Sequence, residues 1–301
     1  MSQAVVAAYL ACALIWGTTW YAIRVCIGPR GYDTLGALAL RFVIAIVILI
    51  PIALRARPWP RGTQWAYLGI AGVLDAVGYL LVYLGEERVP GAVAAVLYGT
   101  QPLILALFLT WTGMEKITRR HMVGAGVSLI GVAVLFFDRL HVSTHQAIGV
   151  TMVISSVVVA TAYSMIMKRH AAGVHGAVST TVFLVVTALV VGVVALIAGD
   201  GEFVWPPPVA PTVALLYLAV IGSVVAFLVY FWLLGKTSLL VTSTLVFVYP
   251  LVAIVTDALF ERREVLTARA YAGTAITLCG LVVSLRRTRD ADDPRSSLRS
   301  A

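Results

Sequence analysis

The sequence predicts an all-α integral membrane protein with ten transmembrane helices, built as two inverted five-helix repeats. Three observations lead to this fold class. Hydrophobic residues make up 60% of the chain and charged residues only 12%, which is too little charge for the surface of a soluble domain of this length. The charges gather in short patches, separated by apolar runs as long as a helix that crosses a bilayer. The two halves of the chain also share an ordered set of residues.

Apolar runs account for most of the chain. Their residues do not alternate as the strands of a transmembrane barrel do, so the runs predict helices. The connector at 55–62 holds Pro58 and Pro60, and the connector at 199–211 holds three consecutive prolines, which are typical of loops. The expected spans, in chain order, are 4–25, 33–53, 65–84, 90–111, 122–138, 147–167, 176–198, 212–234, 238–259 and 268–285.

The charges between the spans predict the orientation. If the N-terminus is cytoplasmic, the cytoplasmic segments carry about twice as many Arg and Lys residues as the outer segments. We therefore expect both termini on the cytoplasmic side of a bacterial-type plasma (inner) membrane. The expected units are a first five-helix repeat at 1–140, a second, inverted repeat at 141–287, and a disordered cytoplasmic tail at 288–301.

The internal repeat is the strongest functional signal in the sequence. Its matching residues, first half and then second, are Tyr67, Leu68, Gly72, Leu84, Gly85, Pro102, Glu115, Thr118, Gly124 and Gly131, and Tyr217, Leu218, Gly222, Leu234, Gly235, Pro250, Glu264, Thr267, Gly273 and Gly280. Glycines seven residues apart share one helix face, which predicts close packing between helices. Because five is an odd number of helices, the second half enters from the opposite side. Such inverted repeats are typical of alternating-access transporters.

Several other protein classes are not supported. The net charge of +8 comes from span ends and the tail rather than from a basic face, so no nucleic-acid partner is expected. Cys12, Cys26 and Cys279 are far apart, and the five histidines lie in connectors or at span ends. We therefore predict no disulfide, no metal site and no cofactor. The sequence has no Gly-x-Ser-x-Gly, HExxH or paired acidic motif, so no catalytic residue is assigned.

Short motifs add a family resemblance. The first span carries IWGTTW at 15–20, and the second carries LRF at 40–42. With the matched prolines and the paired Glu-x-x-Thr…Gly…Gly segments, they resemble the drug/metabolite transporter superfamily, in its ten-helix EamA-like branch. The resemblance covers nearly the whole chain up to about Arg287 and departs from the family pattern at 112–115, at 260–264 and at Tyr249. Similar members export amino acids, their derivatives, or assorted drugs and metabolites, so it implies a carrier of such molecules.

Aromatic and polar residues inside the spans predict the substrate site. As a set they suggest an apolar, aromatic-walled pocket with a few hydrogen-bonding groups, although each alone could face lipid or pack in the core. Phe183 is expected to face lipid. The assigned substrate-binding residues are Trp16, Trp20, Arg41, Asp75, Tyr79, Tyr98, Gln101, Tyr163, Phe227, Tyr230, Phe247 and Tyr249.

Two prolines lie within apolar spans at matching positions. Proline has no backbone N–H, so the carbonyls of Tyr98 and Val246, four residues before Pro102 and Pro250, would lose their partners. In a membrane such a carbonyl needs another partner or a wet cavity. We assign a gating role to both prolines, with a simple packed kink as the alternative.

Two charges lie deep inside spans. Asp75 is near the centre of the third span, where an unpaired charge costs about 3 kcal/mol on insertion scales. It must be protonated, paired, or facing a wet cavity. A static link to Arg41 or Tyr79 is one reading. The other is that Asp75 lines the cavity and binds a substrate ammonium or carries a coupling proton. Arg41 could also snorkel outward or pair with a helix end.

These observations predict a secondary active transporter, in the direction of export, for small metabolites such as amino acids or their derivatives. A multidrug, nucleoside or other metabolite carrier is the alternative, followed by a membrane enzyme without a recognisable motif. The expected partners are a small-molecule substrate and membrane lipids, with proton coupling, and the protein is expected to be a monomer or a homodimer.

Overall fold

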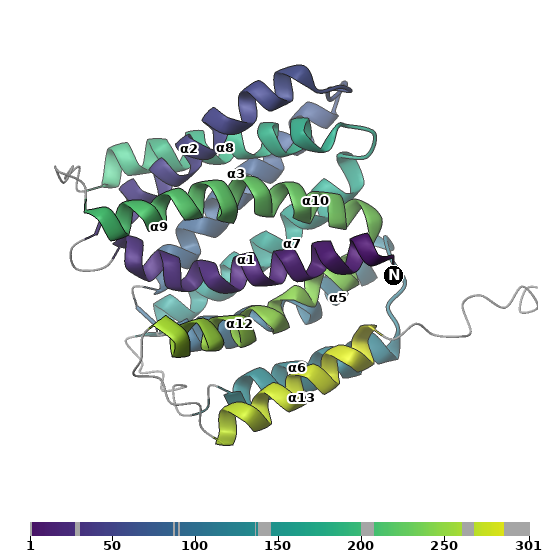
Figure 1. Ribbon diagram of the computed structural model, residues 1–301. Helices are drawn as coiled ribbons and strands as arrows, with labels where there is room; N and C mark the ends of the chain where they lie inside the picture. Colours follow the sequence, from purple (N-terminus) through teal and green to yellow (C-terminus); the bar gives the residue numbers. More distant parts are fainter. Residues whose placement is uncertain are drawn as a thin grey trace, which may run out of the picture.

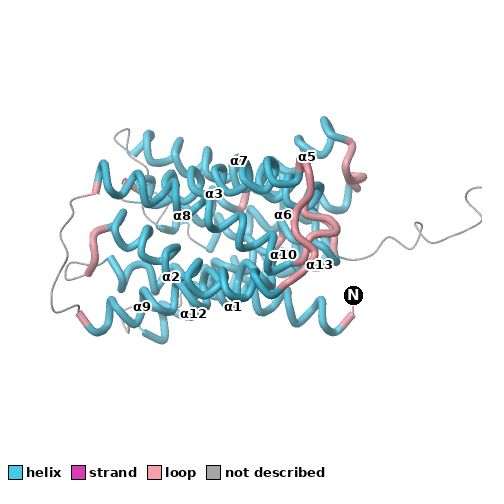
Figure 2. The backbone as a smooth tube through the Cα atoms, turned by 90° about the horizontal axis from the view of Figure 1, so that it is seen from above, coloured by secondary structure: helices cyan, strands magenta, loops and turns pink. Residues whose placement is uncertain are grey.

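The protein is a bundle of long helices that lie side by side (Figures 1 and 2). The computed structural model describes residues 2–27, 31–86, 88–89, 91–135, 137, 146–199, 208–260 and 268–285, and these residues form no strand. The helical elements are α1 (Gln3–Ile27), α2 (Thr34–Arg55), α3 (Gln64–Glu86), α4 (Gly91–Tyr98), α5 (Gln101–Thr112), α6 (Arg119–Leu135), α7 (Ala147–His170), α8 (Gly176–Ala198), α9 (Val209–Ala219), the π-helix η3 (Val220–Val225), α10 (Ala226–Lys236), α11 (Leu239–Ser243), α12 (Leu245–Phe260) and α13 (Ala268–Leu285). The expected tail at 288–301 lies outside the described residues.

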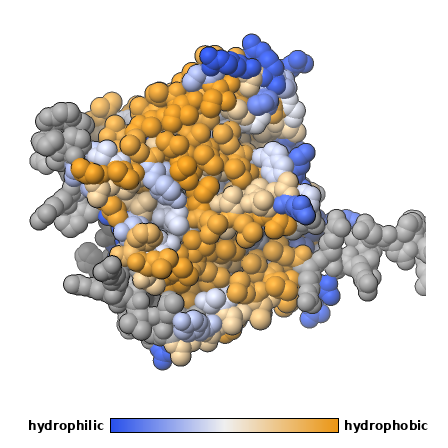
Figure 3. All heavy atoms as spheres, viewed as in Figure 1, coloured by the Kyte–Doolittle hydropathy of each residue, from blue (hydrophilic) through white to orange (hydrophobic). Residues whose placement is uncertain are grey.

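The lengths and compositions of these helices suit a membrane. Seven described helical stretches are long and apolar enough to cross one: Gln3–Ile27, Thr34–Arg55, Gln64–Gly85, Ala147–His170, Gly176–Ala198, Val209–Lys236 and Leu239–Phe260. The other three expected spans contain the shorter helices α4 with α5, α6, and α13. Apolar side chains cover the middle of the surface seen in Figure 3, and hydrophilic ones gather along one edge. The structure thus supports seven crossings by length, against the ten predicted.

The fourth predicted span is broken rather than kinked. α4 ends at Tyr98, and α5 begins after Gly99 and Thr100. The Thr100 amide and hydroxyl both donate to the Leu97 carbonyl, at 3.0 and 2.5 Å. Pro102 therefore lies in the first turn of a new helix, where a missing N–H costs nothing. The alternative to a gating role, a packed kink inside a continuous helix, thus does not describe Pro102. Pro250 does lie inside a helix, α12.

Glycines hold α6 and α13 against each other. A Cβ added to Gly124 would lie 2.7 Å from the Gly280 carbonyl oxygen, and one added to Gly273 would lie 2.8 Å from that of Gly131. The earlier glycine of each helix thus faces the later glycine of the other, so the two helices run antiparallel. These are the glycines that the repeat matched, and their close packing confirms the prediction made from their spacing.

Hydrogen bonds between helix ends define the two ends of the bundle. At one end, the Gln64 side chain at the start of α3 donates to the His170 carbonyl at the end of α7, at 3.1 Å. At the other end, the Tyr32 hydroxyl, just before α2, is 2.8 Å from the Thr212 hydroxyl in the first turn of α9. Arg57 and Arg61 precede α3 at the end where Gln64 and His170 meet, and Lys168 and Arg169 lie in the last turn of α7 there. We call this end of the bundle the basic end.

Candidate functional site

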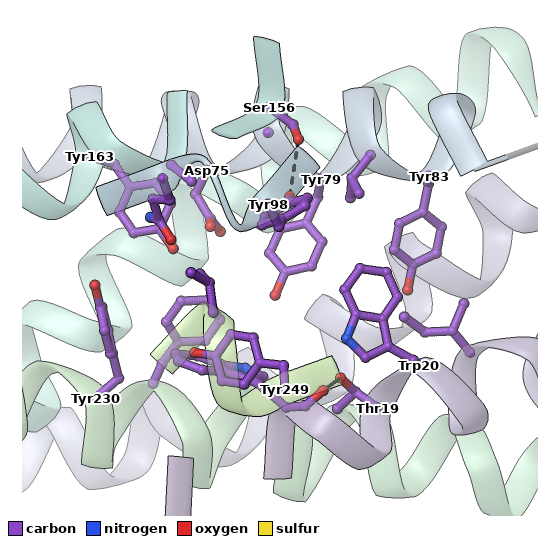
Figure 4. A pocket seen from close by; sticks show the side chains of 18 of the residues that line it. Thr19, Trp20, Asp75, Tyr79, Tyr83, Tyr98, Ser156, Tyr163, Tyr230 and Tyr249 are labelled. Atoms are coloured by element: carbon purple, nitrogen blue, oxygen red, sulfur yellow. Dashed lines mark hydrogen bonds between the residues drawn. The ribbon is translucent and has the colours of Figure 1, made fainter. Parts of the chain in front are cut away.

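A cavity of about 150 Å³ lies inside the bundle, between elements from both halves of the chain (Figure 4). Its lining is Trp16, Thr19, Trp20, Ile23, Arg41, Asp75, Gly78, Tyr79, Val82, Tyr83, Tyr98, Gln101, Ser156, Ala160, Tyr163, Phe227, Tyr230, Thr242, Val246 and Tyr249. Eleven of the twelve predicted substrate-binding residues are in this set. Arg41 and Asp75 are the two charged side chains in the lining.

Trp16 organises the aromatic wall. Its indole meets the rings of Phe227, Tyr230 and Tyr249 edge to face, with centroids 5.8, 5.1 and 5.8 Å apart. Edge-to-face contacts place the positive edge of one ring on the negative face of another, which fixes their orientation. One helix of the first half and two of the second thus build a single rigid wall. Phe183, expected to face lipid, is fully buried and packs behind this wall on Phe227, so that expectation was wrong.

Arg41 is buried, with only 2% of its surface exposed. Its Nε donates to the Ser223 hydroxyl at 2.8 Å, and its Nη2 donates to the Gly222 carbonyl at 3.2 Å. Longer bonds of 3.3 Å reach the hydroxyls of Tyr79 and Tyr83. The side chain therefore does not snorkel outward. It points into the bundle, and all four of these acceptors are uncharged.

The π-helix η3 creates two of these acceptors. In a π-helix the backbone N–H groups bond to carbonyls five residues back instead of four, and in η3 the Gly222 carbonyl also accepts from Arg41. The Ser223 hydroxyl donates to the Leu218 carbonyl, five residues earlier, at 3.0 Å, while its oxygen accepts from Arg41. The π-helix between α9 and α10 thus supplies two hydrogen-bond acceptors to the buried guanidinium.

Asp75 is 1% exposed and lines the same cavity. The hydrogen-bond partner of its Oδ2 is the Thr187 hydroxyl of α8, at 3.0 Å, rather than Arg41 or Tyr79. The same hydroxyl is 3.1 Å from the carbonyls of both Gly72 and Phe183. A hydroxyl carries one proton. Thr187 can therefore donate to an ionised Asp75, or accept from a protonated one and donate to a carbonyl.

Three predicted site residues lie away from the cavity lining. Phe247 is fully buried in a second core cluster with Val132 and Leu135 of α6. Pro102 and Pro250 are buried in their helices and do not line the cavity. Any gating role of the prolines must act through helix shape.

The lining also contains residues that the sequence analysis did not assign to the substrate site. They are Thr19, Ile23, Gly78, Val82, Tyr83, Ser156, Ala160, Thr242 and Val246. Tyr83 had a signal, because it lies one turn beyond Tyr79 on the same helix face. Ser156 had none, and its role is to meet the Tyr98 hydroxyl at 3.0 Å (Figure 4).

Charged contacts tie down the connector between α10 and α11 at the basic end. The Lys168 ammonium of α7 donates to the carbonyls of Leu234 and Thr237, at 2.6 and 2.5 Å. The Glu115 carboxylate accepts from the amides of Leu239 and Leu240, at 2.8 and 3.4 Å. A cation at a helix C-terminus and an anion at a helix N-terminus both match the helix dipole. We call this pair of contacts the connector clamp.

Comparison with known proteins identifies the family to which this architecture belongs. The model of the EamA-like transporter family matches residues 3–137 and 147–286, one match in each half. The chain belongs to the EamA-like transporter family. A solved crystal structure covers 97% of the chain and 100% of its own length with a TM-score of 0.79 at 19% identity, and so has the same fold.

Two of three relatives of this EamA-like protein are named as a transporter or an exporter. "Uncharacterized inner membrane transporter YedA" of Escherichia coli K12 is 26% identical, over 82% of this chain and 79% of its own. "Protein PagO" of Salmonella typhimurium LT2 is 25% identical, over 82% and 81%. "Probable terminal-alkyne amino-acid exporter" of Streptantibioticus cattleyicolor is 26% identical, over 98% of both chains. With the apolar helices, this makes the chain a multi-pass membrane protein with a transporter role.

Proposed function

We propose that the protein is a secondary active transporter that exports small metabolites, such as amino acids or their derivatives, by alternating access around the aromatic cavity. The observation that carries this proposal is the position of the cavity. Trp16 and Tyr98 of the first half and Tyr230 and Tyr249 of the second line it together. A site shared by two repeats can open to either side as one repeat rocks against the other.

The helix packing supports the inverted-repeat part of the proposal. If equivalent helices of two repeats run antiparallel where they meet, the repeats are inverted relative to each other. Gly124 and Gly131 of α6 pack antiparallel to their matches, Gly280 and Gly273, on α13. We therefore assign 1–140 and 141–287 as the inverted repeats and propose ten crossings, with both termini cytoplasmic.

Topology can be tested directly. Tags placed at Thr118 and Thr267, matched positions of which Thr267 lies outside the described residues, should report opposite sides of the membrane. Thr118 should be cytoplasmic, because it lies at the basic end. Both tags on one side would contradict the inverted repeat.

Transport itself is tested in proteoliposomes with an imposed pH gradient and a panel of labelled amino acids, nucleosides and cationic drugs. We expect saturable, concentrative movement of at least one amino acid. Asp75→Asn keeps the shape of the side chain, removes its charge and should abolish concentrative transport, because Asp75 would bind an ammonium or carry the coupling proton. Movement of nucleosides or drugs alone would favour the alternative carriers. No flux from folded, monodisperse protein would refute the transporter proposal.

A further inference from the structure

Arg41 is a buried cation whose hydrogen bonds all go to uncharged oxygens. Of these, the two tyrosine hydroxyls are the more distant acceptors, at 3.3 Å. Buried charges are usually paired, because neutral dipoles replace only part of the hydration that a guanidinium loses. Yet Arg41 lines a cavity large enough for a small molecule. No carboxylate of the described residues is hydrogen-bonded to Arg41, and a ligand in the cavity can supply one.

The hydrogen bonds of Arg41 argue against a role that is only structural. Its contacts with η3, to Ser223 and Gly222, lie at Nε and Nη2, along one edge of the guanidinium. On the other edge, Nη1 donates to the Tyr83 hydroxyl, and Nη2, in addition to its bond to Gly222, donates to the Tyr79 hydroxyl. Both tyrosines also line the cavity. A carboxylate binds a guanidinium through two parallel N–H groups. The edge that meets the tyrosines is the one a carboxylate could approach.

The opposite charge lies within the same cavity. Asp75 is one helical turn before Tyr79 on α3, and its Oδ2 is bonded to Thr187. Oδ1 accepts no protein hydrogen bond in the described part of the chain, and its surface is not completely covered. It is therefore reachable from the cavity, where the carboxyl group points in Figure 4. An ammonium group is a suitable partner for that oxygen.

We propose that the cavity binds a zwitterion, with the ligand's carboxylate on Arg41 and its ammonium on Asp75. The aromatic wall around Trp16 then takes an apolar side chain, so the ligand class is a free amino acid with an apolar side chain. This assignment rests on the proposed function and narrows its substrate. Each charge in the cavity is neutralised by one on the ligand, which an amine or an acid alone cannot do.

Three matched probes test the assignment: phenylalanine, phenylalaninamide, which lacks the carboxylate, and 3-phenylpropionate, which lacks the ammonium. Dissociation constants are measured with the full-length protein in detergent by tryptophan fluorescence, since Trp16 and Trp20 line the cavity. We expect phenylalanine to bind at least about tenfold more tightly than either analogue, because each analogue leaves one buried charged group of the cavity without its partner. Equal constants for the three probes would overturn the proposal without any variant.

Variants assign each charge to its partner. Arg41→Gln should weaken phenylalanine and 3-phenylpropionate but leave phenylalaninamide unchanged, and Asp75→Asn should do the reverse. Ser223→Ala, which removes the acceptor of Nε, should reduce the preference for a carboxylate in part. Arg169→Gln, an exposed arginine at the basic end, is the control and should change nothing. If Arg41→Gln weakens all three probes equally, Arg41 is a strut and the proposal is wrong.

The outcome separates this proposal from the transporter proposal. Flux of a nucleoside or drug in proteoliposomes, with no binding of the phenylalanine series, would overturn the zwitterion site and leave the carrier. Selective binding of phenylalanine, with no flux of any compound, would leave the site and overturn the carrier. If Arg41→Gln does not fold, Arg41→Lys, which keeps the charge but loses the two-pronged geometry, should show a smaller loss of the carboxylate preference, and no loss would count against the proposal.

Discussion

Alanine at Gly124 should separate α6 from α13. The new Cβ would lie 2.5 Å from the Ser284 amide nitrogen and 2.7 Å from the Gly280 carbonyl oxygen. That is about 1 Å closer than an ordinary contact, and both atoms belong to the backbone, so neither can rotate away. The helices must move apart along a seam whose stability in a membrane comes mainly from van der Waals contact.

Two opposing effects set the magnitude. Overpacking of a tight interface costs about 1–3 kcal/mol, whereas Gly→Ala in a helix interior gains about 1 kcal/mol of helix propensity. Gly126 provides a matched control, because it lies on the same helix and a Cβ there meets nothing within 4 Å. We therefore expect Gly126→Ala to be neutral or stabilising, and Gly124→Ala to be less stable than Gly126→Ala by about 1–3 kcal/mol, since the propensity gain is common to both.

The assay is the fraction of folded protein in mixed micelles as the content of a denaturing detergent rises, followed by circular dichroism for wild type and both variants. Comparison of the two variants removes the propensity contribution. Equal midpoints for Gly124→Ala and Gly126→Ala would refute the close-packed seam. The same result would remove the support that the antiparallel glycines give to the inverted repeat.

Three further predictions concern the connector clamp, the proline and the wall. Lys168→Met should speed hydrogen–deuterium exchange in the connector between α10 and α11, because two charge-assisted bonds are lost, each worth about 1.5–3 kcal/mol; Arg169→Met, on the exposed side, should not. Pro250→Ala should leave the amount of folded protein unchanged and slow flux several-fold, because it straightens α12. Wild-type flux would show that Pro250 serves only in packing. Trp16→Ala should raise the substrate dissociation constant by about thirtyfold, whereas Trp111→Ala, at a side chain that is 87% exposed, should not.

Two features of the fold could be predicted from the sequence: the helices, and the close contact between α6 and α13. The apolar runs gave a helix in each expected span, and the glycines seven residues apart gave the seam between α6 and α13. Close backbone approach requires glycine itself, so the residue type carries the structural information. Eleven of twelve proposed cavity residues share one cavity, because the aromatic and polar positions chosen lie in the middle of spans.

Features that depend on neighbouring helices were not readable. Phe183 and Phe247 are both aromatic residues in apolar spans, yet both are fully buried in packing clusters rather than lying on lipid or lining the cavity. In a membrane, hydrophobicity does not tell the inside of a bundle from the outside. The partner of Asp75 was also missed, since Thr187 is 112 positions away and threonine is common in such helices.

The two halves share a pattern of residues, but they differ at the positions that form the site. The spacing that relates Gly72 to Gly222 makes the uncharged Val225 the equivalent of Asp75 in the second half. Gly72, on the regular helix α3, is packed against the Phe183 carbonyl, whereas Gly222 lies in a π-helix and turns its carbonyl to Arg41. Both cavity charges thus come from the first half, and the second half supplies the seat for one of them. If the two halves rock against each other, as we propose for alternating access, the distance between Arg41 and η3 changes. Such a change would move the guanidinium that binds the ligand's carboxylate. The difference between α3 and η3 at these equivalent positions would thus couple the movement of the two halves to binding and release of the ligand.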